Sequence, residues 1–162
     1  MMLHDSKKVY GFTLIELLVA LVLLALLVSS AAPLMQLSAK RNKEQALQKA
    51  LWQIRDAIDA YKQAVDDGLI KASPDQSGYP QSLQQLVGGV DSVDGLNKKK
   101  IYFMRSIPRD PFSTDNTAAA EETWGKRSYS SSFEKPEEGE DIYDVYSLSP
   151  EMGINEQPYR EW

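Results

Sequence analysis

Two hydrophobic patterns follow one another in the first part of the chain. From Leu17 to Val28 there is no polar side chain, and the apolar segment from Phe12 to Ala32 has 21 positions. As a helix it would be about 31 Å long, at about 1.5 Å per residue. That length matches the hydrocarbon core of a bilayer, which is about 30 Å thick. The first pattern therefore predicts a membrane-spanning helix, which we place at residues 12–35.

Beyond Pro33 the pattern becomes amphipathic, and a second helical segment is predicted at residues 36–68. Apolar residues recur there at spacings of four and three, with charged and amide side chains between them: Leu47, Leu51, Ile54, Ile58, Tyr61 and Val65. A single apolar stripe on an otherwise polar helix predicts packing against a sheet of the same chain. Pro33 predicts a kink rather than an end, and Gly68 suits the left-handed cap position.

The remainder, residues 69–162, is rich in turn signals and predicts a small globular head. A short helix is expected at residues 81–87, and two strands at residues 126–133 and 141–148, where Ile, Tyr and Val are frequent. Glu134–Glu140 is the expected loop between these strands, and Lys98–Met104 is expected to lead into the same sheet. The fold class is therefore α+β: a long N-terminal helix, transmembrane and then amphipathic, packed on a small antiparallel sheet.

Composition removes several classes of function. The 162 residues include no cysteine and one histidine, His4, which excludes disulfides and thiolate chemistry and argues against His-based triads and metal sites. The net charge is −5; Asp5, Lys7 and Lys8 give residues 1–11 a charge of +1, so the remainder carries −6. An acidic body argues against nucleic acid as a partner, since phosphate binding needs clustered cations. We expect no catalytic residues and no enzymatic activity.

Glu16 is the exception within the apolar segment. A carboxylate costs roughly 2.5–3.5 kcal/mol at the centre of a membrane helix, so it needs a partner or a route to the interface. A plain membrane anchor, with Glu16 reaching toward the interface, is one interpretation. A secretory signal peptide with Ser30 and Ala32 at the cleavage site is another. Pro33 as the first mature residue suits that cleavage poorly.

Gly11-Phe12-Thr13-Leu14-Ile15-Glu16 resembles the processing motif of type IV pilins and type II secretion pseudopilins. The resemblance implies that a prepilin peptidase/methyltransferase cuts between Gly11 and Phe12 and N-methylates Phe12. It also implies that the leader, residues 1–11, stays in the cytoplasm. Lys7 and Lys8 favour the same orientation. In this family the residue matching Glu16 pairs with the Phe12 amine of a neighbouring subunit, which would supply the missing partner.

Two segments of the head resemble the G-type major pseudopilins: Gly78-Tyr79-Pro80 with Leu83, Leu86 and Val87, and Pro108-Arg109-Asp110-Pro111-Phe112. This resemblance implies a pilin-like fold and a structural subunit of a type II secretion pseudopilus, a filament for protein export. The implied partners are other copies of the chain, minor pseudopilins and the inner-membrane assembly platform. The implied location is the inner membrane, single-pass, with the head in the periplasm.

The segment after the last strand often binds calcium in G-type pseudopilins. The oxygen-bearing side chains in the matching stretch are those of Ser149, Glu151, Asn155 and Glu156, and Ca²⁺ takes about six to eight oxygen ligands. The stretch departs from the family pattern, because Ser149 replaces a glycine, Glu151 replaces an aspartate, and the later paired aspartates are missing. An ordinary polar loop held by Tyr159 and Trp162 is the alternative.

Two other functions remain open. A minor type IV pilin, acting in adhesion, motility or DNA uptake, would share the N-terminal motif; pilins often carry a C-terminal disulfide loop, which this chain lacks. A single-span membrane enzyme or sensor would need a catalytic constellation or a ligand pocket. The serines at 128 and 130–132 have no histidine nearby in the sequence, and Glu121-Glu122 and Glu137-Glu138 are expected at the solvated surface.

Overall fold

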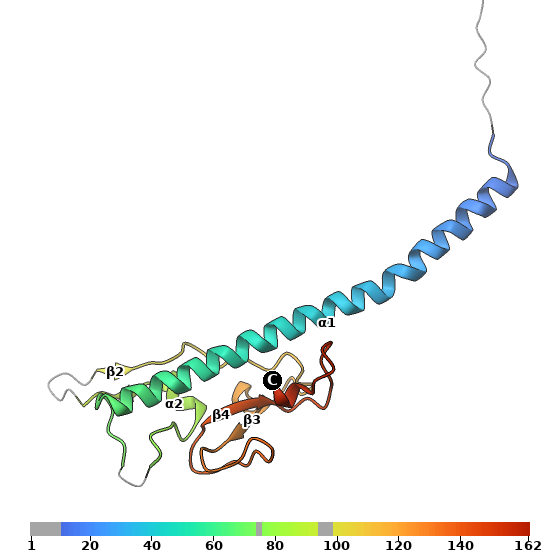
Figure 1. Cartoon of the computed structure of the whole chain (residues 1–162). Helices are drawn as coiled ribbons and strands as arrows, with labels where there is room; N and C mark the ends of the chain where they lie inside the picture. The colour runs from blue at the N-terminus through green and yellow to red at the C-terminus, as the bar shows by residue number, and fades with distance from the viewer. Residues whose placement is uncertain (1–10, 74–75, 94–98) are drawn as a thin grey trace, which may run out of the picture. The chain divides into compact units, whose positions relative to one another are not determined.

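The computed structural model describes residues 11–73, 76–93 and 99–162, and the chain divides into two units at Ala39 and Lys40. The predicted leader therefore lies outside the described residues, apart from Gly11. Helix α1, Leu14–Asp66, contributes to both units and includes Pro33, so the helix does not end at the proline (Figure 1). Its N-terminal part forms the first unit, and its remainder joins the head.

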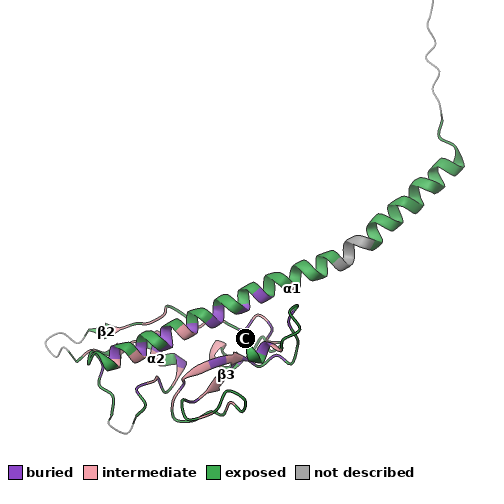
Figure 2. Cartoon of the chain, viewed as in Figure 1, coloured by how far each residue is buried: buried purple, intermediate pink, exposed green. Residues whose placement is uncertain are grey.

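Within the second unit, α1 buries the apolar stripe expected from the sequence. Leu47, Leu51, Ile54 and Ile58 are at most 2% exposed, whereas Trp52 on the other face is 66% exposed. Figure 2 shows the buried positions along one side of the helix. The stripe packs with residues from later in the chain: Ile70, Leu83, Leu86, Phe112, Trp124, Ile142, Val145 and Tyr159. The periodicity of α1 thus marks the core of the head.

The end of α1 follows the prediction for Gly68. Gly68 has a φ of 72°, its N–H donates to the Val65 carbonyl, and the N–H of Leu69 donates to the carbonyl of Ala64. These two bonds close the last turn in the pattern that a left-handed cap residue allows. A side chain at position 68 would be strained in this conformation, since residues other than glycine rarely adopt it.

In its described residues the head contains short helices and two separate two-stranded sheets. Helix α2 is Leu83–Gly88, and the two 3₁₀ turns are Ala120–Thr123 and Tyr159–Glu161. Strands β3, Trp124–Arg127, and β4, Asp144–Ser147, pair antiparallel with Trp124 opposite Ser147 and Arg127 opposite Asp144. Strands β1, Val90–Asp91, and β2, Lys100–Ile101, form the other antiparallel pair.

Two strand predictions need correction. The expected strands at 126–133 and 141–148 exist as a pair, but the ladder covers only 124–127 and 144–147. The ladder stops because the N–H of Ser128 donates to the Glu137 carbonyl, and Ser131 turns back to bond the Ser128 carbonyl. Of the segment expected at Lys98–Met104, residue 98 lies outside the described residues, and residues 99–104 do not lead into this sheet. Lys100 and Ile101 belong to β2, while the N–H groups of Phe103 and Met104 both donate to the Leu86 carbonyl in α2.

Candidate functional site

The peptide bond between Gly11 and Phe12 lies before the first helical residue, Leu14. Both residues are exposed, Phe12 at 84%, and a Cβ added at Gly11 would meet nothing within 4 Å. Non-helical, uncovered backbone is the form that an approaching protease requires. The structure therefore leaves the predicted cleavage position accessible.

Glu16 lies in the first turn of α1 and is paired with Thr13 in the same chain. The N–H of Glu16 donates to Oγ1 of Thr13 at 3.3 Å, and the N–H of Thr13 donates to Oε2 of Glu16 at 3.4 Å. This reciprocal pattern is a capping box, which satisfies two of the helix's free N–H groups. The carboxylate also lies at the positive end of the helix dipole. The sequence signal for this box is Thr13-x-x-Glu16, with the two residues three positions apart.

The apolar segment that follows is exposed in the part of the chain that the structure describes. From Leu14 to Leu37, every large hydrophobic residue whose side chain is described is exposed. Among the described residues, α1 is the one helix long and apolar enough to cross a membrane, with a mean hydropathy of 2.7 in its most apolar window. A surface this apolar is stable only in lipid or against other protein.

A second group of polar contacts joins the head end of α1 to the C-terminal loop, residues 148–158, which lies between β4 and the last 3₁₀ turn. Glu44 is 9% exposed, and its Oε1 accepts hydrogen bonds from the N–H of Ile154 at 2.7 Å and the hydroxyl of Tyr159 at 2.9 Å. One turn earlier, Nζ of Lys40 donates to the Met152 carbonyl at 2.7 Å. Two residues at the start of the loop's tip, Met152 and Ile154, are thereby bonded to α1.

Tyr159 is the buried centre of this arrangement. Its side chain is 0% exposed, and its ring stacks on Phe112 with centroids 4.1 Å apart and meets the edge of Trp162 at 5.0 Å. Burial, and then the hydrogen bond to Glu44, raise the pKa of the Tyr159 hydroxyl well above its ordinary value of 10.0. The hydroxyl therefore remains a donor to Glu44 across the physiological pH range.

Three of the four residues proposed as calcium ligands line two different hollows. Ser149 and Glu151 line a hollow beside Asp110, whereas Asn155 lines a different hollow beside Trp162. The Asn155 amide is bonded to Gln157 through both its oxygen and its nitrogen, and Ser149 Oγ accepts the N–H of Glu151. Across the described ranges no three His, Cys, Asp or Glu side chains form a group that could hold a metal ion.

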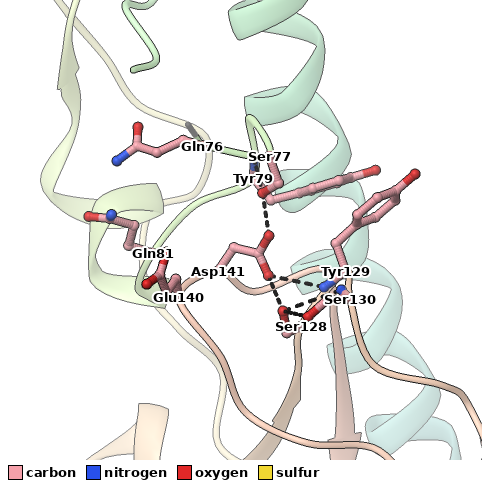
Figure 3. A pocket seen from close by; sticks show the side chains of 9 residues that line it. All are labelled: Gln76, Ser77, Tyr79, Gln81, Ser128, Tyr129, Ser130, Glu140 and Asp141. Atoms are coloured by element: carbon pink, nitrogen blue, oxygen red, sulfur yellow. Dashed lines mark hydrogen bonds between the residues drawn. The ribbon is translucent and has the colours of Figure 1, made fainter. Parts of the chain in front are cut away.

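A hollow of about 250 Å³ surrounds the carboxylate of Asp141 (Figure 3). Asp141 accepts hydrogen bonds from the hydroxyls of Ser77 and Ser128 and from the N–H of Tyr129. Burial alone would raise the pKa of this carboxyl, but the hydrogen bonds together hold it below its ordinary value of 3.8. A carboxylate so stabilised is a weak base, which does not suit it to activate Ser128 as a nucleophile.

The head segments that resemble G-type pseudopilins have structural positions. Asp110 is 3% exposed; its Oδ1 accepts the N–H of Phe112 at 2.7 Å, and its other oxygen accepts the hydroxyl of Ser147 at the end of β4. Gly78 has a φ of 85°, and the ring of Tyr79 meets that of Tyr143 edge-on at 5.1 Å. These residues hold loops of the head in place and surround no reactive group.

Comparison with known proteins gives consistent matches for the N-terminal segment and for most of the chain. Residues 6–32 match the family described as the prokaryotic N-terminal methylation motif. The chain is 31% identical over 120 residues to the type II secretion system core protein G of Vibrio cholerae, covering 70% of this chain and 72% of that protein. It is 29% identical over 109 residues to the protein of the same name from Klebsiella pneumoniae, covering 65% and 70% respectively. No solved structure matches.

Proposed function

This chain belongs to the family of type II secretion core protein G, the pseudopilins, and on that basis we propose that it is a structural subunit of a type II secretion pseudopilus. In this role the chain is cut, inserted as a single span, and polymerised through its N-terminal helix for protein export. It performs no catalysis of its own. The observation that supports this most directly is the exposed apolar segment from Leu14 to Leu37, which begins immediately after an accessible Gly11–Phe12 bond.

Processing is the first step of the proposal. A prepilin peptidase/methyltransferase cuts between Gly11 and Phe12, removes residues 1–11, and methylates the new amine of Phe12. The exposure of both residues and their position before α1 support this assignment. Residues 12–35 then form the membrane-spanning and filament-core segment, residues 36–68 the amphipathic helix, and residues 69–162 the head in the periplasm.

Assembly is the second step. In the single chain, Glu16 is held by the Thr13 capping box at the start of α1. We propose that in the filament its carboxylate pairs with the methylated Phe12 amine of a neighbouring copy. The pair would offset the cost of a carboxylate in apolar surroundings, since an unpaired charge there is strongly unfavourable. Other copies, minor pseudopilins and the inner-membrane assembly platform are the proposed partners.

Two alternatives are less well supported. A minor type IV pilin would share the N-terminal motif, but the relatives matched over most of the chain are secretion proteins. A membrane-anchored enzyme would need an activated group, and in the described part of the head the Asp141 hollow is built from satisfied hydrogen bonds rather than from a nucleophile and its base.

The test is the mass of the mature protein, purified from a host that carries the secretion system. The expected N-terminus is Phe12 bearing one methyl group. Gly11→Leu should leave the chain uncut, because a bulky side chain now stands at the cleavage position, while Trp52→Ala should be cut normally. A wild-type chain that still begins at Met1, or that begins at Pro33, would contradict the proposal.

A further inference from the structure

The C-terminal loop, residues 148–158, is the segment in which G-type pseudopilins often hold calcium. The structure allows a direct test of whether this chain's residues fit such an ion. A Ca²⁺ site needs about six to eight oxygen atoms, with carboxylates and backbone carbonyls turned toward a common point. Both kinds of oxygen occur in and around the loop. Whether they fit an ion depends on the hydrogen bonds that each of them already accepts.

The loop's oxygens are directed elsewhere. Glu151 and Glu156 are exposed. Glu151 lines a hollow with Asp110, Asp115 and Glu122, but within the described residues no three acidic side chains form a group that could hold a metal ion. The carbonyl of Met152 accepts Lys40 Nζ, and the carbonyl of Gly153 accepts the N–H of Glu156 at 3.0 Å. The Asn155 amide oxygen accepts the N–H of Gln157. The donor set therefore does not fit a calcium ion.

Two side chains of α1 supply charges of both signs to the loop. The Lys40 ammonium contacts a backbone carbonyl, which is the kind of oxygen that a bound cation would otherwise coordinate. The Glu44 carboxylate accepts one backbone N–H and one hydroxyl, which a cation could not do. Hydrogen bonds to charged groups are stronger than neutral ones, and Glu44 makes its bonds at a position that is largely shielded from water.

The contacts of α1 reach the start of the loop's tip and, through Tyr159, the residue that follows the loop. Met152 is bonded to Lys40, Ile154 is bonded to Glu44, and Met152 pairs with Pro158 in an antiparallel bridge that closes the tip. Across the base of the tip, the N–H of Gly153 donates to the carbonyl of Gln157 at 2.8 Å. The loop is thus closed at its base and anchored at two points on α1. A bound metal ion would otherwise hold the loop in this way.

We propose that Lys40 and Glu44 of α1 replace a metal ion in this chain, and that the C-terminal loop is held in place without calcium. This inference concerns the folding of the head and does not rest on the role of the chain in secretion. A failure of the filament proposal would leave it intact, because its readouts are unfolding and proteolysis.

The first experiment compares thermal unfolding of the full chain in detergent with millimolar CaCl₂ and with excess EGTA. The expected result is the same midpoint in both. A calcium ion that binds only the folded head, present at about 1,000 times its dissociation constant, would raise the midpoint by about 10 °C. A rise of that kind, or heat of calcium binding in a titration of the full chain, would overturn the inference.

The second experiment removes the anchors one at a time and follows protease cleavage within residues 148–158. Lys40→Met keeps most of the side-chain length but loses the ammonium, and Glu44→Gln loses the charge. Each should raise the rate of cleavage in the loop at least tenfold. Lys49→Met is the matched control, since Lys49 is an exposed lysine of the same helix.

Lys40 is only half-buried, so Lys40→Met should leave the head folded, and its cleavage rate reports on the loop alone. Tyr159→Phe provides a further check on Glu44, because it removes the donated hydroxyl while the stacked ring remains. It should also speed cleavage. If Lys40→Met and Glu44→Gln are cut in the loop no faster than Lys49→Met, the two residues are not the anchors and the inference is wrong.

Discussion

Arg55 of α1 pairs with Asp144 of β4, with 2.7 Å between Nε and Oδ1, although 89 positions separate the two residues. Arg127 of β3 approaches the other oxygen of the same carboxylate at 3.0 Å. Arg55 also donates to the carbonyls of Val145 and Trp162. One guanidinium and one carboxylate thereby join the long helix, the β3–β4 pair and the end of the C-terminal segment.

Asp144→Asn should destabilise the head by about 1.5–3 kcal/mol, because two part-buried guanidinium groups lose their anion. Urea denaturation of the full chain in detergent measures this change. Glu137→Gln is the control: its partner Lys135 lies 2.6 Å away, but their side chains are 60% and 83% exposed. An exposed pair contributes at most about 1 kcal/mol. Equal losses for the two variants would contradict the structural role given to Asp144.

Leu51 and Trp52 are neighbours in sequence on α1, but Leu51 is buried and Trp52 is exposed. Leu51→Ala should lower the free energy of unfolding by about 2–5 kcal/mol, because it leaves a cavity in the hydrophobic core of the head. Trp52→Ala should change it by no more than about 0.5 kcal/mol, since the indole is 66% exposed. Denaturant midpoints of the two variants provide the comparison, and a larger loss for Trp52→Ala would place the buried face of α1 elsewhere.

The Asp141 carboxyl should make the head sensitive to Ser128. A carboxyl whose pKa is lower in the folded state stabilises the fold at pH values above 3.8, its ordinary value, and this stability is lost as the pH falls through the folded-state pKa. Ser128→Ala removes one donor and should raise the pKa of Asp141, so acid unfolding should begin at a higher pH.

Circular dichroism followed from about pH 6 to about pH 2 measures the acid transition, the range being set by the ordinary pKa of carboxyl groups. Ser132→Ala is the matched control, because Ser132 accepts a bond from the Lys135 N–H and does not contact Asp141. Coincident acid transitions for Ser128→Ala and Ser132→Ala would show that Ser128 does not stabilise the ionised form of Asp141.

Glu16 has two proposed partners, Thr13 in its own chain and the Phe12 amine of another, and one pair of variants separates them. Glu16→Gln keeps an oxygen for the capping box but loses the charge, whereas Glu16→Ala loses both. Both should be cut after Gly11 as the wild type is, and both should fail to enter filaments if the charge pair is required. Filament yield and the mature mass measure the two outcomes. Normal assembly of Glu16→Gln would reduce Glu16 to a helix cap.

The long helix was predictable because its signals are local. The spacing of Leu47, Leu51, Ile54 and Ile58 identifies the buried face without knowledge of what covers it. The β3–β4 pair was also expected, but its ends were not. The end of β3 depends on Ser128. Its N–H donates to the Glu137 carbonyl, and its hydroxyl donates to Asp141, which is 13 positions away. Short strands give too little alternation for their ends to be read from the sequence.

The two polar contacts that matter most to the site differ in how visible they were. Thr13 and Glu16 form a local pattern that a search for helix starts would have found. Glu44 gives no such signal, because its partner Tyr159 is 115 positions away and a single acidic residue on an amphipathic helix suggests only a wet face. The proposed replacement of a metal ion by Lys40 and Glu44 therefore could not be predicted from the sequence.

The contacts between α1 and the C-terminal part of the head join residues that are synthesised far apart in time. Lys40, Glu44 and Arg55 find their partners between residues 144 and 162, at separations of 89 to 115 residues. Contacts this distant close late and slow folding. A growing chain therefore exposes the membrane segment long before the last residues of the head are available. The head can close over α1 only after residues 144–162 have been synthesised.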